Sequence, residues 1–197
     1  MKQLLIATGN EHKLNEFRTL LADLPVELVG LRDVGITDDV AETGDTFEAN
    51  ARLKADAYCR QSGLPTLADD SGLVVDALGG APGVYSARYG GVKGAAQLVL
   101  VLEQLRDVPP NQRTARFVCV LALAMPGTVT TVVHGTVEGV IGDEPRGTHG
   151  FGYDPIFVLP ERNVTMAELL PENKNRISHR GRAVAAMRPL LRTHFAS

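Results

Sequence analysis

Thr8, Gly9 and Asn10 run into the charged segment Glu11–Lys13, and this turn has the residue types of a phosphate-binding site. A helix N-terminus presents unpaired backbone N–H groups and partial positive charge, so a lysine there is mildly unfavourable unless an anion binds. Gly9 permits close backbone approach, and Asn10 and Lys13 would complete a site for a phosphate group. The alternative is an ordinary capped helix in which Lys13 pairs with Glu16, three residues further on.

Asn50 and Lys54 stand one helical turn apart, in a segment that follows Glu42-Thr43-Gly44. They share a face at the edge of an apolar stripe, which is an unusual position for a lysine that serves only solubility. The stripe consists of Phe47, Ala51, Ala55 and Tyr58. The alternative is that Lys54 extends past the stripe and places its ammonium group in water.

Asp69-Asp70-Ser71-Gly72 lies between two short apolar runs, Thr66–Ala68 and Leu73–Val75. Its composition is typical of a tight turn, because Asp, Ser and Gly all favour turns. If the flanking runs are strands, they hold the carboxylates on a rigid frame, where an aspartate can bind Mg²⁺ or orient a water molecule. Adjacent side chains of a strand point to opposite faces, so only one of Asp69 and Asp70 would then face a given site.

Two further segments carry groups suited to a nucleotide. Phe151-Gly152-Tyr153-Asp154 puts two aromatic rings and a carboxylate on a loop, where Phe151 could stack on a base; alternatively, both rings are tucked into the core. Ser178-His179-Arg180-Gly181 offers donors for a phosphate or a carbonyl oxygen, although Ser178 can instead be a helix cap and His179 an ordinary surface residue. The motifs of P-loop NTPases, zincins and α/β-hydrolases are absent from the sequence.

The elements that must position these groups are mixed strands and helices. Strands are expected at 2–8, 26–29, 66–68, 73–75, 116–125, 129–141 and 156–158, and helices at 11–21, 43–61, 94–105 and from about 180 onward. The β-branched segments 116–125 and 129–141, separated by Pro126-Gly127, predict a long antiparallel hairpin. This pattern predicts an α/β or α+β fold, and we expect one domain over residues 1–197.

Composition restricts the class of protein further. The longest apolar run, Phe117–Met125, is about half of what a membrane-spanning helix needs, and the N-terminal apolar run is too short for a signal peptide. We therefore expect a cytoplasmic protein with no membrane partner. Cys59 and Cys119 match no metal-binding or redox spacing, and are expected to be reduced, buried thiols.

Charge is unevenly distributed along the chain. All 23 acidic residues lie at or before Glu172, whereas Lys174 and five arginines follow it. A basic end of this kind suits a phosphate-bearing ligand, a helix packed on an acidic surface, or a nucleic-acid contact. Charge alone does not choose among the three.

In their order along the chain, these motifs resemble the inosine and xanthosine triphosphate pyrophosphatase family. The matching stretches span nearly the whole sequence, and Ser86-Ala87-Arg88-Tyr89 makes the resemblance more specific. The stretches are Thr8–Lys13, Glu42–Lys54, Ala68–Leu73, Gly79–Tyr89, Phe151–Pro155 and Ser178–Gly181.

The resemblance implies an elongated central mixed sheet flanked by helices in two lobes, with the nucleotide in a cleft between them, and a homodimer. It also implies that Asp70 is the catalytic base and that Glu42 and Asp70 bind Mg²⁺. Ala41 and Ala49 stand where many relatives carry acids, which excludes those two positions as metal ligands. Substrate contacts are implied for Thr8, Gly9, Asn10, Lys13, Lys54, Ser71, Lys174, His179 and Arg180, and base contacts for Phe151, Gly152, Tyr153 and Asp154.

The implied reaction is attack of water on the α-phosphorus of a deaminated purine nucleoside triphosphate (ITP, dITP, XTP or dXTP), which releases a monophosphate and pyrophosphate and cleanses the nucleotide pool. An unperturbed aspartate, with a pKa of about 3.9, is a weak base for water, so metal assistance is expected.

Two alternative functions fit part of the sequence. One is a pyrophosphatase of related fold that acts on modified pyrimidine nucleotides. The other is a non-catalytic nucleotide- or RNA-binding module, which leaves Glu42 and Asp70 without a purpose, so we expect no nucleic-acid partner.

Overall fold

The computed structural model describes residues 2–195 of the chain. Its strands form one seven-stranded mixed sheet in the order β2-β1-β3-β4-β5-β6-β7. This confirms the expected mixed α/β fold. Among the described residues, unit 1 comprises 2–70, 119–135 and 180–195, and unit 2 comprises 71–118 and 136–179. The expected single domain and the expected cleft stay predictions.

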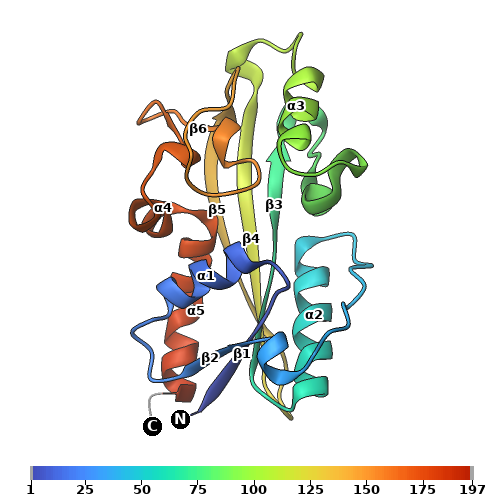
Figure 1. Cartoon of the computed structure of the whole chain (residues 1–197), viewed down its shortest axis with the longest axis vertical. Coiled ribbons are helices and arrows are strands. Elements are labelled where there is room, and N and C mark those ends of the chain that lie inside the picture. The colour runs from blue at the N-terminus through green and yellow to red at the C-terminus, as the bar shows by residue number, and fades with distance from the viewer. Residues whose placement is uncertain (1, 196–197) are drawn as a thin grey trace. The chain divides into compact units, whose positions relative to one another are not determined.

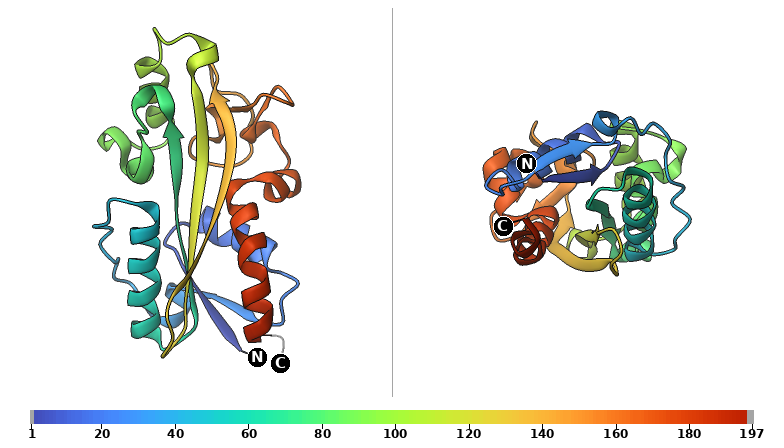
Figure 2. Two further views of the ribbon diagram at one scale, coloured as in Figure 1. Left: turned by 180° about the vertical axis from the view of Figure 1, so that it is seen from behind. Right: turned by 90° about the horizontal axis from the view of Figure 1, so that it is seen from below.

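Unit 1 is built on parallel strands. β1 (Gln3–Ala7) pairs with β2 (Glu27–Gly30) on one side and with the first residues of β3 (Thr66–Val75) on the other. Helices α1 (Glu11–Leu20) and α5 (His179–Phe195) share one apolar core with these strands, and α2 (Phe47–Ser62) lies on the side of β1 opposite α5 (Figures 1 and 2). That core includes Leu4, Ile6, Phe17, Leu67, Leu121, Val184, Met187 and Leu191.

Unit 2 contains a second apolar core. β4 (Thr114–Ala124) and β5 (Thr131–Ile141) have residues in both units and are neighbours in the sheet, as the predicted hairpin requires. β6 (Phe157–Leu159) pairs antiparallel with β5 and with β7 (Val164–Thr165). Helices α3 (Ala95–Gln104) and α4 (Pro171–Ile177) complete the unit. The core includes Leu73, Leu98, Val101, Phe117, Val137, Ile156, Phe157 and Met166.

The tight turn considered for Asp69-Asp70-Ser71-Gly72 is wrong, because β3 runs without interruption from Thr66 to Val75. Gly72 instead allows another segment of the chain to lie close to the strand. A Cβ atom at this position would collide with Ser86 Oγ and the carbonyl oxygen of Gly83, so only glycine allows that segment to approach the strand. The approach is used, since Ser86 Oγ accepts the backbone N–H of Leu73 at 2.9 Å.

The second predicted helix starts later than expected. The sequence predicted a start at Thr43, whereas α2 begins at Phe47 and Thr46 is its N-cap, accepting the N–H of Ala49 at 3.1 Å. Thr43, Gly44 and Asp45 therefore stay outside the helix. The N–H of Gly44 donates instead to Asn50 Oδ1 at 2.8 Å, which ties the preceding loop to the helix.

The basic C-terminal segment packs on acidic side chains, one of the three alternatives considered. Arg188 donates to both carboxylate oxygens of Asp23 at 2.5 and 2.7 Å, and Arg192 contacts the same carboxylate at 3.3 Å. Arg180 pairs with Glu16 and with Asp69. Much of the uneven charge in the sequence is therefore neutralised within unit 1.

Both cysteines are free and buried, as expected. Burial raises the pKa of the Cys119 thiol to about 12, so it stays protonated in any ordinary buffer. We expect Cys119 not to react with Ellman's reagent at about pH 8 in the folded protein, and to react after unfolding in guanidinium chloride. A Cys119→Ser variant identifies its share of the absorbance change. Rapid reaction of Cys119 in the native protein would contradict its burial.

None of the helices within residues 2–195 combines the length and the apolar character that crossing a bilayer requires.

Candidate active site

The residues expected to form the site fall into two groups, one in each unit. The group in unit 1 includes the residues expected to act on the phosphates and the metal, and the group in unit 2 includes those expected to bind the base together with three further expected substrate contacts. Unit 1 contains Thr8, Gly9, Asn10, Lys13, Glu42, Lys54, Asp70 and Arg180. Unit 2 contains Ser71, Phe151, Gly152, Tyr153, Asp154, Lys174 and His179.

The turn before α1 has the expected cap. Asn10 Oδ1 accepts the backbone N–H groups of His12 at 2.9 Å and Lys13 at 3.3 Å, and Thr8 Oγ1 accepts the N–H of Asn10 at 3.2 Å. The alternative pairing of Lys13 with Glu16 is wrong. Lys13 Nζ instead lies 3.1 Å from a carboxylate oxygen of Asp69, which β3 supplies from 56 residues away.

Lys54 is held between two carboxylates. Its Nζ donates to Glu42 Oε1 at 2.6 Å and to Asp70 Oδ1 at 3.1 Å, and only 12% of its side chain is exposed. The alternative in which Lys54 reaches into water is therefore wrong. Asn50, one turn earlier on α2, is fully buried and its amide Nδ2 donates to the other oxygen of Asp70 at 3.3 Å.

Burial and charge shift the pKa values of this cluster in a consistent way. Burial alone would lower the pKa of Lys54, but the negative charges of Asp70, Asp69 and Glu42 outweigh it and raise the pKa. Lys54 therefore stays charged. Burial raises the pKa of Asp70 against the opposing effect of Lys54, and Glu42 raises it further. Asp70 is consequently a stronger base than an aspartate in water.

Asp69 and Asp70 lie on opposite faces of β3, as a continuous strand requires. Asp70 contacts Asn50 and Lys54 of α2, whereas Asp69 contacts Lys13 of α1 and Arg180 of α5. Asp69 was not expected among the site residues. The alternation of a strand predicted that Asp69 and Asp70 would face different sites, but not which partners Asp69 would meet.

Glu42 and Asp70 have donor groups that fit a divalent metal. Both present carboxylate oxygens to one ammonium group, so the two side chains already converge on a positive charge. Among residues 2–195, no group of three or more His, Cys, Asp and Glu side chains is placed to hold a metal ion. Two carboxylates still fit Mg²⁺, which is usually bound by one or two carboxylates together with waters and substrate phosphates.

In unit 2, a buried ion pair fixes the loop expected to bind the base. Lys174 Nζ of α4 lies 2.6 Å from Asp154 Oδ2, and the side chains are 4% and 3% exposed. The same oxygen accepts the backbone N–H of Phe151 at 2.8 Å. The Lys174 ammonium group also lies 4.8 Å from the centre of the Phe151 ring. The loop conformation therefore depends on one carboxylate and one ammonium group.

The other aromatic residue of this loop is structural in its contacts. Tyr153 is buried and its hydroxyl donates to the carbonyl oxygen of Ser86 at 2.9 Å. The alternative in which the rings are tucked into the core is thus confirmed for Tyr153, whereas Phe151 is only half-buried. His179 is also buried and stacks on Phe117 with ring centres 4.9 Å apart, so the surface alternative for His179 is wrong.

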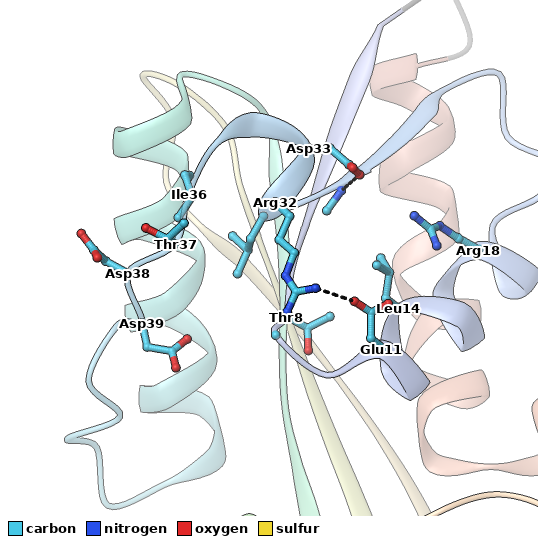
Figure 3. A pocket seen from close by; sticks show the side chains of 13 residues that line it. Thr8, Glu11, Leu14, Arg18, Arg32, Asp33, Ile36, Thr37, Asp38 and Asp39 are labelled. Atoms are coloured by element: carbon cyan, nitrogen blue, oxygen red, sulfur yellow. Dashed lines mark hydrogen bonds and ion pairs between the residues drawn. The ribbon is translucent and has the colours of Figure 1, made fainter.

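A cavity of about 450 Å³ adjoins the turn before α1 (Figure 3). Thr8 and Gly9 line it, together with Arg32 and Glu11, whose side chains lie 4.0 Å apart. Leu14 and Arg18 of α1 and Gly30 of β2 also line it, and the rest of its wall comes from the segment that follows β2, including Asp38 and Asp39. None of the residues that bind Lys54 belongs to this cavity.

A model of the Ham1 family matches residues 4–190 of the chain. A dITP/XTP pyrophosphatase of Geobacillus kaustophilus is 54% identical over 95% of this chain and 93% of that protein. A dITP/XTP pyrophosphatase of Bacillus subtilis is 47% identical over 97% of this chain and 98% of that protein. Among solved structures, a HAM1 protein from Coxiella burnetii superposes with a TM-score of 0.89 and 43% identity, over 98% of this chain and 100% of that chain.

Proposed function

Because the chain belongs to the Ham1 family, we propose that it hydrolyses deaminated purine nucleoside triphosphates to the monophosphate and pyrophosphate. The observation that carries this proposal is the Lys54 ammonium group held between Glu42 and Asp70. A buried carboxylate, a half-buried carboxylate and a charged lysine provide a base, metal ligands and a stabilising cation within one cluster.

Asp70 is the proposed base and orients the attacking water. Burial raises its pKa, which favours this role, and metal assistance is still expected for the step. Glu42 and Asp70 are the proposed ligands of Mg²⁺, which when bound would acidify the water and neutralise charge on the leaving pyrophosphate. Lys54 stays protonated beside them and stabilises the negative charge that develops on the phosphate oxygens.

The turn before α1 is the proposed phosphate-binding segment. Thr8, Gly9, Asn10 and Lys13 are its proposed contacts, and Asn10 orders the turn by capping α1. The backbone N–H of Lys13 already donates to Asn10 Oδ1. The charged side chain of Lys13 is therefore the main attraction for a phosphate group.

The unit 2 group is the proposed binding site for the base. Phe151 offers a ring face for stacking, and Gly152, Tyr153 and Asp154 fix the loop around it. Ser71, Lys174 and His179 are further proposed substrate contacts in this unit, and Arg180 is one in unit 1. A 6-oxo purine needs a donor aimed at its oxygen, and a 6-amino purine would bring two donors together there. The N–H of Phe151 already donates to Asp154, and both terminal nitrogens of Arg180 already donate to carboxylates. These bonds favour His179 or another amide of the loop as that donor.

A nucleotide panel tests the proposal. With Mg²⁺ present, we expect ITP, dITP and XTP to yield pyrophosphate and the monophosphate, with kcat/KM at least about a hundredfold above that for ATP or GTP. Chromatography identifies the nucleotide, and a pyrophosphate-specific coupled assay identifies the inorganic product. Release of orthophosphate in place of pyrophosphate would contradict attack at the α-phosphorus.

The same panel separates the rivals. Preference for modified pyrimidine triphosphates would favour the related pyrimidine enzyme, and RNA binding with steep salt dependence and no turnover would favour a binding module. A homodimer, a cytoplasmic location and the absence of a nucleic-acid partner are part of the proposal. Sedimentation analysis of the purified protein tests the dimer.

A further inference from the structure

Lys13 is held in one conformation by a single carboxylate. Its Nζ lies 3.1 Å from Asp69 Oδ2 and 3.2 Å from Asp69 Oδ1, so the ammonium group is shared by both oxygens. The side chain of Lys13 is 16% exposed and that of Asp69 is 1% exposed. A lysine side chain that is free in solution samples many rotamers. Asp69 removes much of that freedom before any ligand arrives.

Asp69 is held in turn by an arginine of α5. It lies on β3, and Arg180 Nη2 of α5 donates to its Oδ2 at 3.0 Å. Arg180 Nη1 contacts Glu16 Oε2 of α1 at 2.5 Å. Ion pairs with Lys13 and Arg180 therefore hold the buried carboxylate from two sides.

The contact with Asp69 leaves Lys13 able to bind a phosphate. An ammonium group has three N–H donors, so Lys13 can keep its contact with Asp69 while another donor meets a phosphate oxygen. Arg180 also contacts Asp69, so the carboxylate keeps a buried guanidinium partner if the ammonium group shifts. A lysine in the first turn of a helix is unfavourable without a nearby anion, and Asp69 supplies that anion in the free protein.

We infer that Asp69 is the positioning residue for Lys13. It holds the ammonium group of Lys13, in the first turn of α1, in the place where that group meets the phosphates of the substrate, while Asp70 on the opposite face of β3 holds Lys54. Asp69 contacts neither the substrate nor the metal in this arrangement. This inference rests on the proposed function, because it gives Lys13 the role of a phosphate ligand.

A double-mutant cycle tests this. Asp69→Asn should raise the KM for ITP at least about tenfold, which is the loss expected when one charged hydrogen bond to phosphate is weakened. Lys13→Met should show the same division of its effect between KM and kcat. In the Lys13→Met background, Asp69→Asn should change KM less than about twofold, because its target is already gone. If Asp69→Asn does not fold, Asp69→Glu replaces it in the same double-mutant cycle. The glutamate keeps the negative charge but moves it away from its position in the wild-type protein.

Asp23→Asn is the matched control, since Asp23 pairs with another arginine of α5 but does not contact Lys13. It should leave KM unchanged. Additive effects of Asp69→Asn and Lys13→Met, or a fall in kcat alone at constant KM, would overturn the inference and assign Asp69 a purely structural role.

Calorimetric binding of inorganic triphosphate distinguishes a failure of this inference from a failure of the proposed function. If wild-type protein neither hydrolyses ITP nor binds triphosphate, the proposed function and this inference both fall; if it does both and the cycle is additive, only this inference falls.

Discussion

Replacing Asp70 by asparagine is expected to lower kcat for ITP at least about a hundredfold while the nucleotide still binds. General-base assistance typically contributes 10²- to 10⁴-fold, and asparagine cannot take a proton from water. Asparagine keeps the size of the side chain and can still accept a hydrogen bond from Lys54, so the structure should persist. Steady-state kinetics with ITP and Mg²⁺ give kcat, and binding of a non-hydrolysable ITP analogue gives the affinity.

Asp76→Asn is the control for this experiment. Asp76 follows β3 directly and its carboxylate pairs with Arg116 at 3.0 Å, so the change also removes one negative charge with a basic partner. It lies outside the group around Lys54 and should leave kcat within about twofold of wild type. Turnover close to wild type in Asp70→Asn would remove Asp70 from the mechanism.

Lys174→Met should lower the free energy of unfolding by about 3 to 5 kcal/mol, because it leaves Asp154 as a buried carboxylate without its ammonium partner. The loop that carries Phe151 should loosen as well, since Asp154 also accepts the N–H of that residue. We therefore expect weaker binding of ITP in addition to the loss of stability. Urea denaturation followed by circular dichroism measures the free energy.

The double variant Lys174→Met with Asp154→Asn separates charge from packing. It removes both charges of the pair, so it should recover a large part of the stability that Lys174→Met loses. Glu138→Gln is the control, because Glu138 pairs with Arg116 at an exposed position of the same unit and should shift the urea midpoint very little. A Lys174→Met protein as stable as wild type would mean that Asp154 does not depend on this lysine.

Local sequence patterns predicted the elements whose signals are local. The spacing of Leu14 and Phe17 predicted α1, and both side chains are buried in its core. Asn10 was expected to cap that helix and does so. The β-branched segments on either side of Pro126-Gly127 became β4 and β5, neighbours in the sheet. In each case the residues that decide the structure stand within a few positions of one another.

The errors have equally physical causes. Ser71-Gly72 was read as a possible turn because turn propensity is local, whereas the requirement for glycine comes from Ser86, fourteen residues beyond Gly72. α4 was missed because its seven residues are mostly polar and show no apolar stripe. The partners of the charged residues were also out of reach. Arg180 and Glu16 are 164 positions apart, and only the folded chain brings them together.

The uninterrupted path of β3 limits how the chain can change in length. Because side chains alternate along a strand, inserting or deleting one residue before Asp69 would exchange the faces of Asp69 and Asp70. Lys13 and Lys54 would then each meet the wrong neighbour, although every residue would still be present. Loops tolerate a change of one residue, but in β3 the alternation of side chains decides which lysine each carboxylate meets. Natural and engineered variants should therefore tolerate substitutions in this stretch more readily than a shift of one position.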